Sequence, residues 1–560
     1  MNAPTGAEAM VRMLDLHEVR HVFGLCGDTS LPFYDALHQL DHRIEHVLTR
    51  DERSAGYMAD AYARVTGRVG VCEGPSGGGA TYLLPGLVEA NESCVPVLGI
   101  TSDVAVTARG RYPLTELDQQ GLYRPATKWN GTVDRAAQLP GMVRTAFRAM
   151  TTGRPGAAHL CLPYDVQREP VDADDLWAQA EHGAAPAWRS APDPRDVERA
   201  AEALVAARRP VIVAGGGVVG AGATEALAAL ARLLDAPVCT TVTGQGAIAE
   251  TDPYAAGVVG SNGGIPATRA VVEAADLVLF VACRAGSTTT EHWRFPGRAA
   301  TIVHLDCDPA VIAANYRTEV ALVGDARLGL GALVEAVGSG RPNAGEGRAA
   351  AGAAQAGKAA QFARLSGSDA RPILPERLVA ALQAVLPDDA IVVADPGTPC
   401  PYLSGYYTWR RAGRHFLTNR AHGALGYALP ASLGAWYGRP ANKICAVMGD
   451  GSFGFAVGEL ETLVRCRAPI LMVVVSNAVY GWIKASQRAS YGGRYYSVDF
   501  TSTDHARIAE AYGVRSWRVE DPADLEGTLR RAAEHGGPAL VDVVCQPLQD
   551  AAAPVSQWMG

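Results

Sequence analysis

An aspartate and an asparagine near the end of the sequence have the chemistry to bind a hard cation. Asp450 stands between Gly449 and Gly451, and 25 residues separate Gly451 from Asn477. A carboxylate and an amide oxygen suit Mg²⁺, which usually completes its coordination shell with phosphate and water oxygens. The two glycines allow a sharp turn and a close approach of the backbone to a ligand. The pair therefore indicates a site for a magnesium ion and a phosphate-bearing ligand.

Two buried parallel strands joined by a helix are expected to position this pair. Residues 444–448 and 470–475 are short apolar runs, as in strands that are covered on both faces. Residues 455–464 between them have helical spacing. Asp450 and Asn477 then follow the carboxyl ends of the strands, where open α/β sheets bind ligands. The alternative is an ordinary strand–helix–strand unit with a solvated aspartate.

The composition is that of a globular protein with several domains. The chain has 560 residues, of which 48% are hydrophobic and 19% are charged, so three or four domains are expected. Its net charge is −8, from 50 basic and 58 acidic residues, and no basic run stands out. We therefore expect no nucleic acid and no anionic membrane as a partner.

Cysteine usage and the first residues favour a cytoplasmic protein. The 11 cysteines are scattered without a C-x-x-C pair, as expected of small buried side chains in a reducing compartment. The longest apolar runs, such as residues 277–283, are too short to span a bilayer. The first residues lack the basic segment and the continuous apolar segment of a signal peptide.

Two acids in the first part of the chain also stand at predicted strand ends. Asp28 follows a strand predicted at residues 22–26 and precedes a helix. Its ordinary role is an N-cap, whose side-chain oxygen accepts a free backbone N–H, but the position would also face a ligand cleft. Glu52 follows a strand predicted at residues 45–48 and begins a long helix. Its ordinary role is a first-turn acid that the helix dipole stabilises.

Residues 52–67 resemble the segment that carries the activating glutamate of thiamine diphosphate (ThDP) enzymes of the acetolactate synthase, pyruvate oxidase and 2-oxo acid decarboxylase type. The Gly-Asp-Gly turn at 449–451, with Asn477, resembles the diphosphate-binding motif of the same family. Residues 76–81 are similar to its S-G-P-G-A-T loop, with glycine in the place of the proline. Residues 395–399 are similar to its D-x-G-T-P-T string. The resemblance covers nearly the whole chain, with the motifs in family order.

This resemblance implies an α/β fold with three doubly wound parallel-sheet domains. They would be a pyrimidine-binding domain at residues 1–165, a central domain at 190–340 and a diphosphate-binding domain at 370–548. Residues 165–196 and the Ala/Gly-rich residues 338–368 are interpreted as linkers, the second of them flexible. In the family the cofactor lies between the first domain of one subunit and the third domain of another. A homodimer or homotetramer with inter-subunit active sites is therefore implied.

The resemblance also implies roles for individual residues. Glu52 would bond N1′ of the aminopyrimidine, and Asp450, Asn477 and the Val479 carbonyl would bind Mg²⁺. Leu425 fills the slot of the family's apolar residue that bends the cofactor, although a leucine in an apolar stretch is ordinarily a core residue. Further cofactor-binding positions are Gly397, Thr398, Gly423, Gly449, Gly451, Ser452, Tyr480 and Gly481.

Asp28 and His422 complete the set of catalytic candidates. A histidine in the position of His422, close to Gly423 and Leu425, is ordinarily structural, but at a cofactor cleft it could titrate near neutral pH. Two departures from the family pattern leave the substrate open. Thr115 stands where acetolactate synthases have a glutamine, and the paired histidines of pyruvate decarboxylases are absent.

The implied reaction is the ThDP- and Mg²⁺-dependent decarboxylation of a 2-oxo acid, with transfer of the acyl carbanion to a carbonyl acceptor, as in acetolactate synthase. Two other enzymes are alternatives: a simple decarboxylase that releases an aldehyde, and a CoA-thioester decarboxylase. A non-catalytic ThDP- or nucleotide-binding protein is a third, although a scaffold would not require Glu52.

Two glycine motifs suggest other classes of site. Residues 74–78 match the G-x-S-x-G nucleophile elbow of hydrolases, but Pro85 interrupts the next helix and no partner acid or histidine is identifiable by spacing. Residues 215–220 match the dinucleotide-binding G-x-G-x-x-G, but the next strand ends in threonines instead of an acid. Some family members carry FAD in this domain. Only Arg284 of their flavin-binding string survives here, so we expect no FAD.

Overall fold

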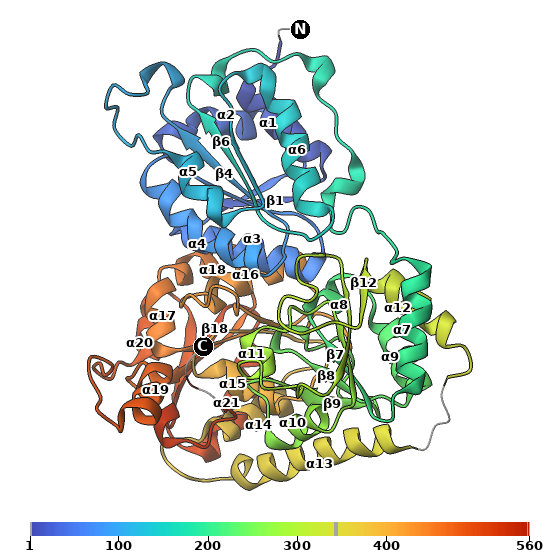
Figure 1. Cartoon of the computed structure of the whole chain (residues 1–560). Helices are drawn as coiled ribbons and strands as arrows, with labels where there is room; N and C mark the ends of the chain where they lie inside the picture. Colours follow the sequence, from blue (N-terminus) through green and yellow to red (C-terminus); the bar gives the residue numbers. More distant parts are fainter. Residues whose placement is uncertain (1–2, 341–344, 557, 559–560) are drawn as a thin grey trace. The chain divides into compact units, whose positions relative to one another are not determined.

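Three six-stranded sheets organise the chain (Figure 1). The computed structural model describes residues 3–340, 345–556 and 558. All paired strands of the three sheets run parallel. This confirms the predicted α/β class with three parallel-sheet domains.

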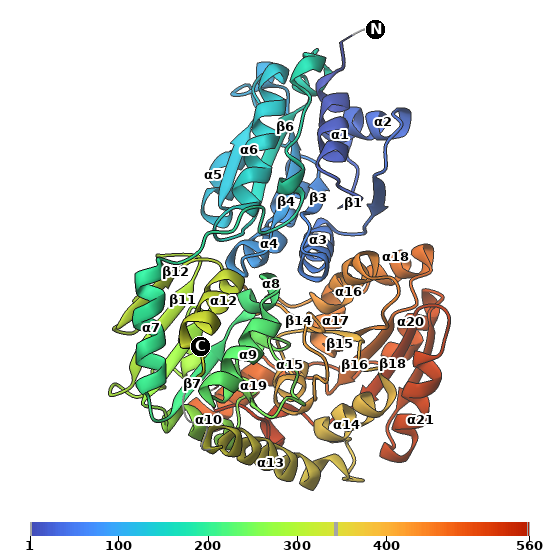
Figure 2. The ribbon, with the colours of Figure 1, turned by 90° about the vertical axis from the view of Figure 1, so that its right-hand side faces the viewer.

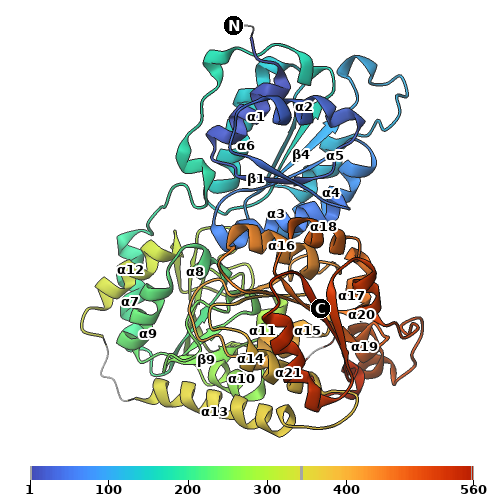
Figure 3. The same ribbon diagram turned by 180° about the vertical axis from the view of Figure 1, so that it is seen from behind.

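The first sheet has its helices on both faces. Its strands are β1 (His21–Gly24), β2 (Glu45–Leu48), β3 (Gly70–Gly74), β4 (Val97–Asp103), β5 (Trp129–Thr132) and β6 (Ala158–Pro163), in the order β2-β1-β3-β4-β6-β5. Its helices are α1 (Gly6–Leu16), α2 (Leu31–Gln39), α3 (Glu52–Thr66), α4 (Gly78–Glu92), α5 (Gln119–Tyr123) and α6 (Leu139–Thr151). Apolar side chains of α1, α2 and α6 form one core with the sheet. Helices α3 and α4 pack on its other face (Figure 3).

The second sheet is also covered on both faces, by two separate apolar clusters. Its strands are β7 (Pro210–Ala214), β8 (Val238–Thr240), β9 (Ala255–Val258), β10 (Leu277–Val281), β11 (Thr301–Asp306) and β12 (Val320–Val323), in the order β12-β11-β10-β7-β8-β9. Its helices are α7 (Pro194–Ala206), α8 (Gly216–Gly220), α9 (Thr224–Leu234), α10 (Pro266–Glu273), α11 (Ser287–Thr290), α12 (Ala326–Val337) and α13 (Glu346–Ser366).

The third sheet repeats the strand order of the first. Its strands are β13 (Ile391–Ala394), β14 (Phe416–Thr418), β15 (Ile444–Gly449), β16 (Leu471–Ser476), β17 (Arg515–Val519) and β18 (Ala539–Val544), in the order β14-β13-β15-β16-β18-β17. The helices of this part of the chain are α14 (Pro375–Val385), α15 (Pro399–Tyr406), α16 (Ala428–Gly438), α17 (Asp450–Ala456), α18 (Glu459–Cys466), α19 (Gly481–Tyr491), α20 (His505–Ala511) and α21 (Pro522–Ala533). In the first sheet β2 lies on one side of β1 and β3 on the other, and in the third sheet β14 and β15 lie on either side of β13 in the same way. The strand order therefore reverses between β1 and β3 and between β13 and β15. Open α/β sheets bind ligands at such a switch point.

The chain folds into two compact units. The first unit contains residues 3–188, 419–441 and 456–468, so α16 and α18 belong to it although they follow the second sheet in sequence. The second unit contains the second and third sheets. Within the first unit α3 packs closely along α16 (Figure 2). A Cβ on Gly434 of α16 would overlap the Met58 carbonyl of α3, so only glycine allows this approach.

Helix α13 corrects one expectation from the sequence. Residues 338–368 were expected to be a flexible linker, but residues 346–366 form a helix of 21 residues. The segment is rich in alanine, which is the strongest helix former. It lacks the apolar periodicity by which helices are usually predicted from a sequence. It packs instead through small side chains and through Lys358, whose ammonium is 2.6 Å from the Glu250 carboxylate, with both side chains buried. Figure 2 shows α13 running past α10 and α14.

The segment after Asp450 corrects another expectation from the sequence, the single helix at residues 455–464. The structure forms two helices, α17 and α18, where residues 455–464 were expected to form one. The first begins directly at Asp450, at the end of β15, so the turn between strand and helix is shorter than expected. The strands on either side, β15 and β16, were predicted within one residue at each end. Over the part of the chain described, no helix has the length and apolarity needed to cross a bilayer.

Candidate active site

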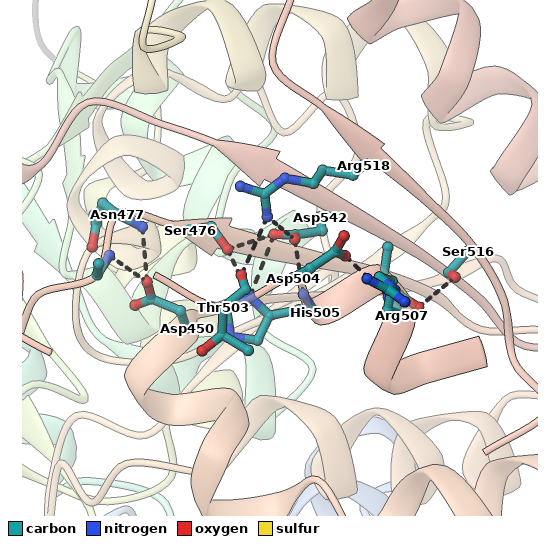
Figure 4. Close-up of polar contacts among 12 residues, drawn as sticks. Asp450, Ser476, Asn477, Thr503, Asp504, His505, Arg507, Ser516, Arg518 and Asp542 are labelled. Carbon is teal, nitrogen blue, oxygen red and sulfur yellow. Dashed lines mark hydrogen bonds and ion pairs between the residues drawn. The ribbon is translucent and has the colours of Figure 1, made fainter. Parts of the chain in front are cut away.

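Asp450 and Asn477 lie together at the carboxyl edge of the third sheet (Figure 4). One carboxylate oxygen of Asp450, Oδ2, accepts the backbone N–H groups of Asn477 at 2.8 Å and Ala478 at 2.6 Å. The other, Oδ1, accepts the N–H of Gly451 at 2.8 Å. Because β15 and β16 are neighbours, the carboxylate ties the two strand ends to each other.

The surroundings of this pair fit a cation and an anionic ligand. Asp450 is buried, and burial raises its pKa although the three backbone N–H groups oppose the shift. A cation would remove the cost of burying the negative charge. Among the described residues no acceptor takes the buried amide nitrogen of Asn477, which leaves it free to donate to a ligand oxygen. The donor set therefore fits Mg²⁺ together with a diphosphate.

Other predicted cofactor-binding residues gather at the same edge. A Cβ on Gly481, which begins α19, would lie 3.1 Å from Oγ1 of the buried Thr398. A Cβ on Gly451 would meet the ring of Tyr480 at 2.8 Å. Val479 is buried just before them. The sheet therefore brings together residues from the ends of β13, β15 and β16. Buried Ser452 follows Gly451, and Gly397 and Gly449 have open space beside their Cα atoms within the described structure.

Glu52 is the first residue of α3, in the first unit. The residue is 7% exposed, and burial raises its pKa. The glycine-rich loop after β3 makes room for it, because a Cβ on Gly79 would lie 3.0 Å from the Glu52 carboxylate. The neighbouring Asp51 is the N-cap that accepts the N–H of Arg53, so Glu52 does not serve as the cap. The structure thus gives Glu52 a buried place instead of the solvated first-turn position of an ordinary acid.

Asp28 does not have the N-cap role that its position suggested. A short 3₁₀ turn, Asp28–Ser30, separates β1 from α2, so Ser30 is the residue before α2 and Gly27 precedes the turn. Asp28 is exposed. The next residue, Thr29, donates to the Ser76 hydroxyl at 3.0 Å, which places Asp28 at the carboxyl edge shared by β1 and β3.

His422, Gly423 and Leu425 lie in the loop between β14 and α16, in the first unit. His422 is exposed, but its backbone N–H donates to the buried Glu89 of α4 at 2.7 Å. Gly423 has φ +71°, a conformation that favours glycine. Leu425 is half-buried, so it is not an ordinary core residue. The loop therefore holds these residues at the surface of the unit.

Comparisons with known proteins agree with this geometry. Three family models match the chain: the N-terminal TPP binding domain of thiamine pyrophosphate enzymes at residues 4–122, their central domain at 197–333 and their C-terminal TPP binding domain at 395–543. The chain belongs to the thiamine pyrophosphate enzyme family. The resemblance inferred from the motifs is thereby confirmed, and the chain is a ThDP-dependent enzyme related to acetolactate synthase large subunits.

Three relatives are similar to the chain over more than nine-tenths of their own length. A probable acetolactate synthase large subunit of Methanococcus aeolicus is 34% identical over 557 residues, which cover 97% of this chain and 92% of the relative. A second, from Methanocaldococcus jannaschii, is 33% identical with the same coverage. The acetolactate synthase isozyme 3 large subunit of Escherichia coli is 31% identical over 537 residues, which cover 95% of this chain and 93% of the relative.

The central domain of this ThDP enzyme uses its glycine motif for packing. A Cβ on Gly215 would overlap the Ala282 carbonyl. The guanidinium of Arg414 donates to the carbonyls of Thr243 at 2.9 Å and Gly216 at 3.0 Å. Close packing against Ala282 thus accounts for Gly215 and Gly217, whereas Gly220 has no described heavy atom within 4 Å of its Cβ position. Likewise Ser76, the serine of the hydrolase-like motif, bonds the hydroxyls of Thr29 and Thr115.

Sequence reasoning missed several buried polar residues of this ThDP enzyme. Glu73, in β3, is buried, accepts a 2.7 Å hydrogen bond from Tyr34, and has its pKa raised to about 8 by burial. A second group surrounds Asp542 in β18, next to Ser476. The sequence held one signal for each, a charged residue within a run otherwise typical of a buried strand.

Proposed function

We propose that this enzyme decarboxylates a 2-oxo acid with ThDP and Mg²⁺ and transfers the acyl group to a carbonyl acceptor, as an acetolactate synthase-like carboligase. The observation that carries the proposal is Glu52, a buried carboxyl with a raised pKa at the start of α3. A protein that only bound the cofactor would have no need of such a group. Full-length similarity to proteins named acetolactate synthase large subunit supports the choice of reaction.

The residues of the chain have separate tasks in this proposal. ThDP, when bound, supplies a nucleophilic carbon and an electron sink for decarboxylation. Asp450, Asn477 and the Val479 carbonyl hold Mg²⁺, and the amide nitrogen of Asn477 donates to a diphosphate oxygen. Glu52 holds a proton at N1′ of the aminopyrimidine and returns it during turnover. The raised pKa suits this task, because general acid–base groups work best with a pKa near the working pH.

Residues of the loop before α16 orient the cofactor in the same proposal. Leu425 would support the bound cofactor by apolar contact, and the carbonyl of Gly423 would accept a hydrogen bond from its aminopyrimidine amine. We propose His422 and Asp28 as the groups that exchange protons with substrate or product. Both side chains are exposed in their own units, so each is accessible to a ligand.

One observation favours a second candidate, a decarboxylase that releases an aldehyde. Thr115 is exposed, has φ +71° and bonds the Ser76 hydroxyl at 2.7 Å. A short hydroxyl thus stands where acetolactate synthases have a longer amide. If Thr115 does not reach the carbonyl of an acceptor, the acyl carbanion would be protonated instead, and an aldehyde would be released.

The same proposal includes the quaternary structure and the central domain. We propose a homodimer or homotetramer in which the first domain of one subunit completes the site of another. We also propose that the central domain carries no flavin, which is supported by the packing of its glycine motif against Ala282. Native mass measurement and the absorption spectrum of the purified protein test these two points.

Product analysis tests the proposed reaction. The protein is incubated with ThDP, Mg²⁺ and single 2-oxo acids, alone and in pairs or with an aldehyde, and products are identified by NMR. The proposal expects carbon dioxide together with a condensed hydroxy-ketone product. Stoichiometric free aldehyde in the presence of an acceptor would support the decarboxylase instead, and absence of carbon dioxide with every 2-oxo acid would contradict both.

A further inference from the structure

A buried polar cluster lies beside the candidate metal site (Figure 4). It consists of Asp542 in β18, Ser476 at the end of β16, His505 at the start of α20 and Arg518 in β17. Asp542 is 0% exposed, and Ser476 and His505 are buried with it. Four separate elements thus meet at one carboxylate. Neither the family motifs nor the proposed reaction uses any of these side chains.

Both carboxylate oxygens of Asp542 accept hydrogen bonds from neighbouring residues. Its Oδ1 accepts the hydroxyl of Ser476. Its Oδ2 accepts the backbone N–H of His505 at 3.0 Å and the Arg518 guanidinium at 2.7 Å. Burial alone would raise the pKa of Asp542, but the bonds from His505 and Ser476 and the charge of Arg518 hold it below its ordinary value. Such a satisfied buried network is rigid, because any displacement leaves a charged group unpaired.

The direction of the hydrogen bonds shows what the cluster does not do. The Ser476 oxygen lies 2.9 Å from Nδ1 of His505 as well as against Asp542. A carboxylate can only accept, so the serine proton points to Asp542, and His505 must donate to Ser476. In a hydrolytic triad the histidine accepts the serine proton. The three residues are therefore arranged to orient one another and not to activate a nucleophile.

The cluster contacts both elements that carry the candidate metal ligands. Ser476 directly precedes Asn477, so the bond to Asp542 fixes the last residue of β16 before the ligand. On the other side, the ring of His505 packs edge-on against Phe453 of α17, with centroids 5.5 Å apart and an interplanar angle of 88°. Helix α17 begins at Asp450, three residues before Phe453.

We propose that Asp542 is a positioning residue for the metal–diphosphate site, acting through Ser476 and His505. It holds the end of β16 and the start of α17 in register, so that the oxygens of Asn477 and Asp450 face one cation. Residues behind metal ligands orient them in this way, and their loss weakens metal binding without removing a ligand. The inference rests on the proposed function, because it assumes that Asp450 and Asn477 bind Mg²⁺.

Magnesium-dependent ThDP binding tests the proposal without reference to turnover. The apoprotein with a fixed concentration of ThDP is titrated with MgCl₂, and bound ThDP is measured by equilibrium dialysis. Ser476→Ala removes the link between Asp542 and β16 but leaves Asp542 paired with Arg518 and the His505 backbone. We expect its half-saturating Mg²⁺ concentration to rise ~10–100-fold. At saturating Mg²⁺ the variant should bind ThDP as the parent does.

A matched variant separates positioning from general loosening. Ser516 is equally buried and donates to the Ala506 carbonyl at 2.7 Å, so Ser516→Ala removes a hydroxyl bond that also holds α20 but does not touch β16 or α17. We expect Ser516→Ala to bind Mg²⁺ as the parent does. Ser476→Thr retains the hydroxyl and should recover much of the lost affinity. Asp542→Asn should weaken Mg²⁺ binding too, and if that variant does not fold, Ser476→Ala decides alone.

Two results would overturn the inference. One is parent-like half-saturation by Mg²⁺ in Ser476→Ala, and the other is an equal weakening in Ser516→Ala. A failure of the proposed function looks different. In that case ThDP binding would not depend on Mg²⁺ in the parent, or Asp450→Asn would bind ThDP normally, and both proposals would fall together.

Discussion

At the scale of residues, the candidate site depends on acids that the fold buries beside glycines. Asp450 and Glu52 both stand at the start of a helix and are both less than 10% exposed, at 6% and 7%. Burial raises the pKa of each. The carboxylate of Asp450 accepts three backbone N–H groups, whereas Glu52 is held in a space that glycines leave open. The same physical effect thus suits the roles that we propose for them, Asp450 as a metal ligand and Glu52 as a proton donor.

Removing the charge of Asp450 should separate its metal role from its structural role. Asp450→Asn keeps the shape of the side chain and one acceptor oxygen, so it retains part of the three backbone bonds, whereas Asp450→Ala loses all three. We expect both variants to lose Mg²⁺-dependent ThDP binding, measured by equilibrium dialysis. Asp450→Ala should lose more stability to urea, since each bond to a charged group contributes ~1.5–3 kcal/mol.

Asp521→Asn is the control for this experiment. Asp521 also accepts a backbone N–H, from Ala523 at 3.0 Å, but it caps α21 after the edge strand β17, and no described hydrogen bond joins it to Asp450 or Asn477. Its replacement should leave ThDP binding unchanged. Parent-like binding in Asp450→Asn would refute the metal site.

Glu73 should make the stability of the protein fall as the pH rises. Its pKa is raised from 4.5 to about 8 in the folded protein, so the folded state keeps a proton that the unfolded chain releases. Its contribution is most favourable below the unfolded pKa and is lost as pH rises through 8. From pH 6 to 9 the loss should be about 2–3 kcal/mol.

Glu73→Gln retains an acceptor for Tyr34 and cannot ionise. Urea unfolding at pH 6 and pH 9 should therefore show that this variant gains on the parent at the higher pH. An unchanged difference between the two proteins at both pH values would show that Glu73 does not ionise over this range.

At the scale of elements, the sequence predicted the pieces that carry an apolar pattern. Strands β15 and β16 stand out because every residue in them is apolar or small, and the Asp450–Asn477 spacing follows from them. Helix α13 could not be predicted in this way, because its buried face consists of alanines and one lysine. Of the cluster around Asp542 the sequence marks only the aspartate, since the four side chains come from elements that only the folded chain brings together.

The buried ion pair of α13 should be strongly coupled. Lys358 and Glu250 have side chains 8% and 6% exposed, and the lysine also donates to the Tyr407 carbonyl at 3.2 Å. Lys358→Met leaves Glu250 buried without its cation, which should cost ~3–5 kcal/mol of unfolding free energy. Adding Glu250→Gln should recover part of that loss. A double variant as unstable as the sum of the single variants, in urea unfolding, would show that the two residues do not interact.

At the scale of the whole molecule, the chain repeats one strand order in its first and third sheets and builds its first unit from three separate segments. The family resemblance anticipated three sheets, although its motifs lie at strand ends of the first and third sheets only. It did not anticipate that α16 packs along α3, nearly 400 residues away, since a contact between two helices rich in small residues has no local signature.

A valine in place of Gly434 should disturb this assembly. The new side chain would overlap the backbone of α3 at Met58, and overpacking of this kind costs at least ~1–3 kcal/mol. Gly331 of α12 is a matched control, because it also lies within a helix but has no described heavy atom within 4 Å of its Cβ position. Thermal unfolding should show a lower midpoint for Gly434→Val and not for Gly331→Val. Equal midpoints would contradict the close packing of α3 and α16.

Exchange of the C2 proton of bound ThDP tests most directly the central claim that Glu52 moves a proton for the cofactor. Glu52→Gln should still bind ThDP, because Mg²⁺ and the diphosphate hold it, but C2 exchange in deuterated buffer, followed by NMR after acid quenching, should slow ~10²–10⁴-fold. Glu376→Gln is the control, since Glu376 is also a buried first-turn acid with a raised pKa, in α14, and should exchange as the parent does. Parent-like exchange in Glu52→Gln would contradict the assignment and, with it, the proposed catalysis.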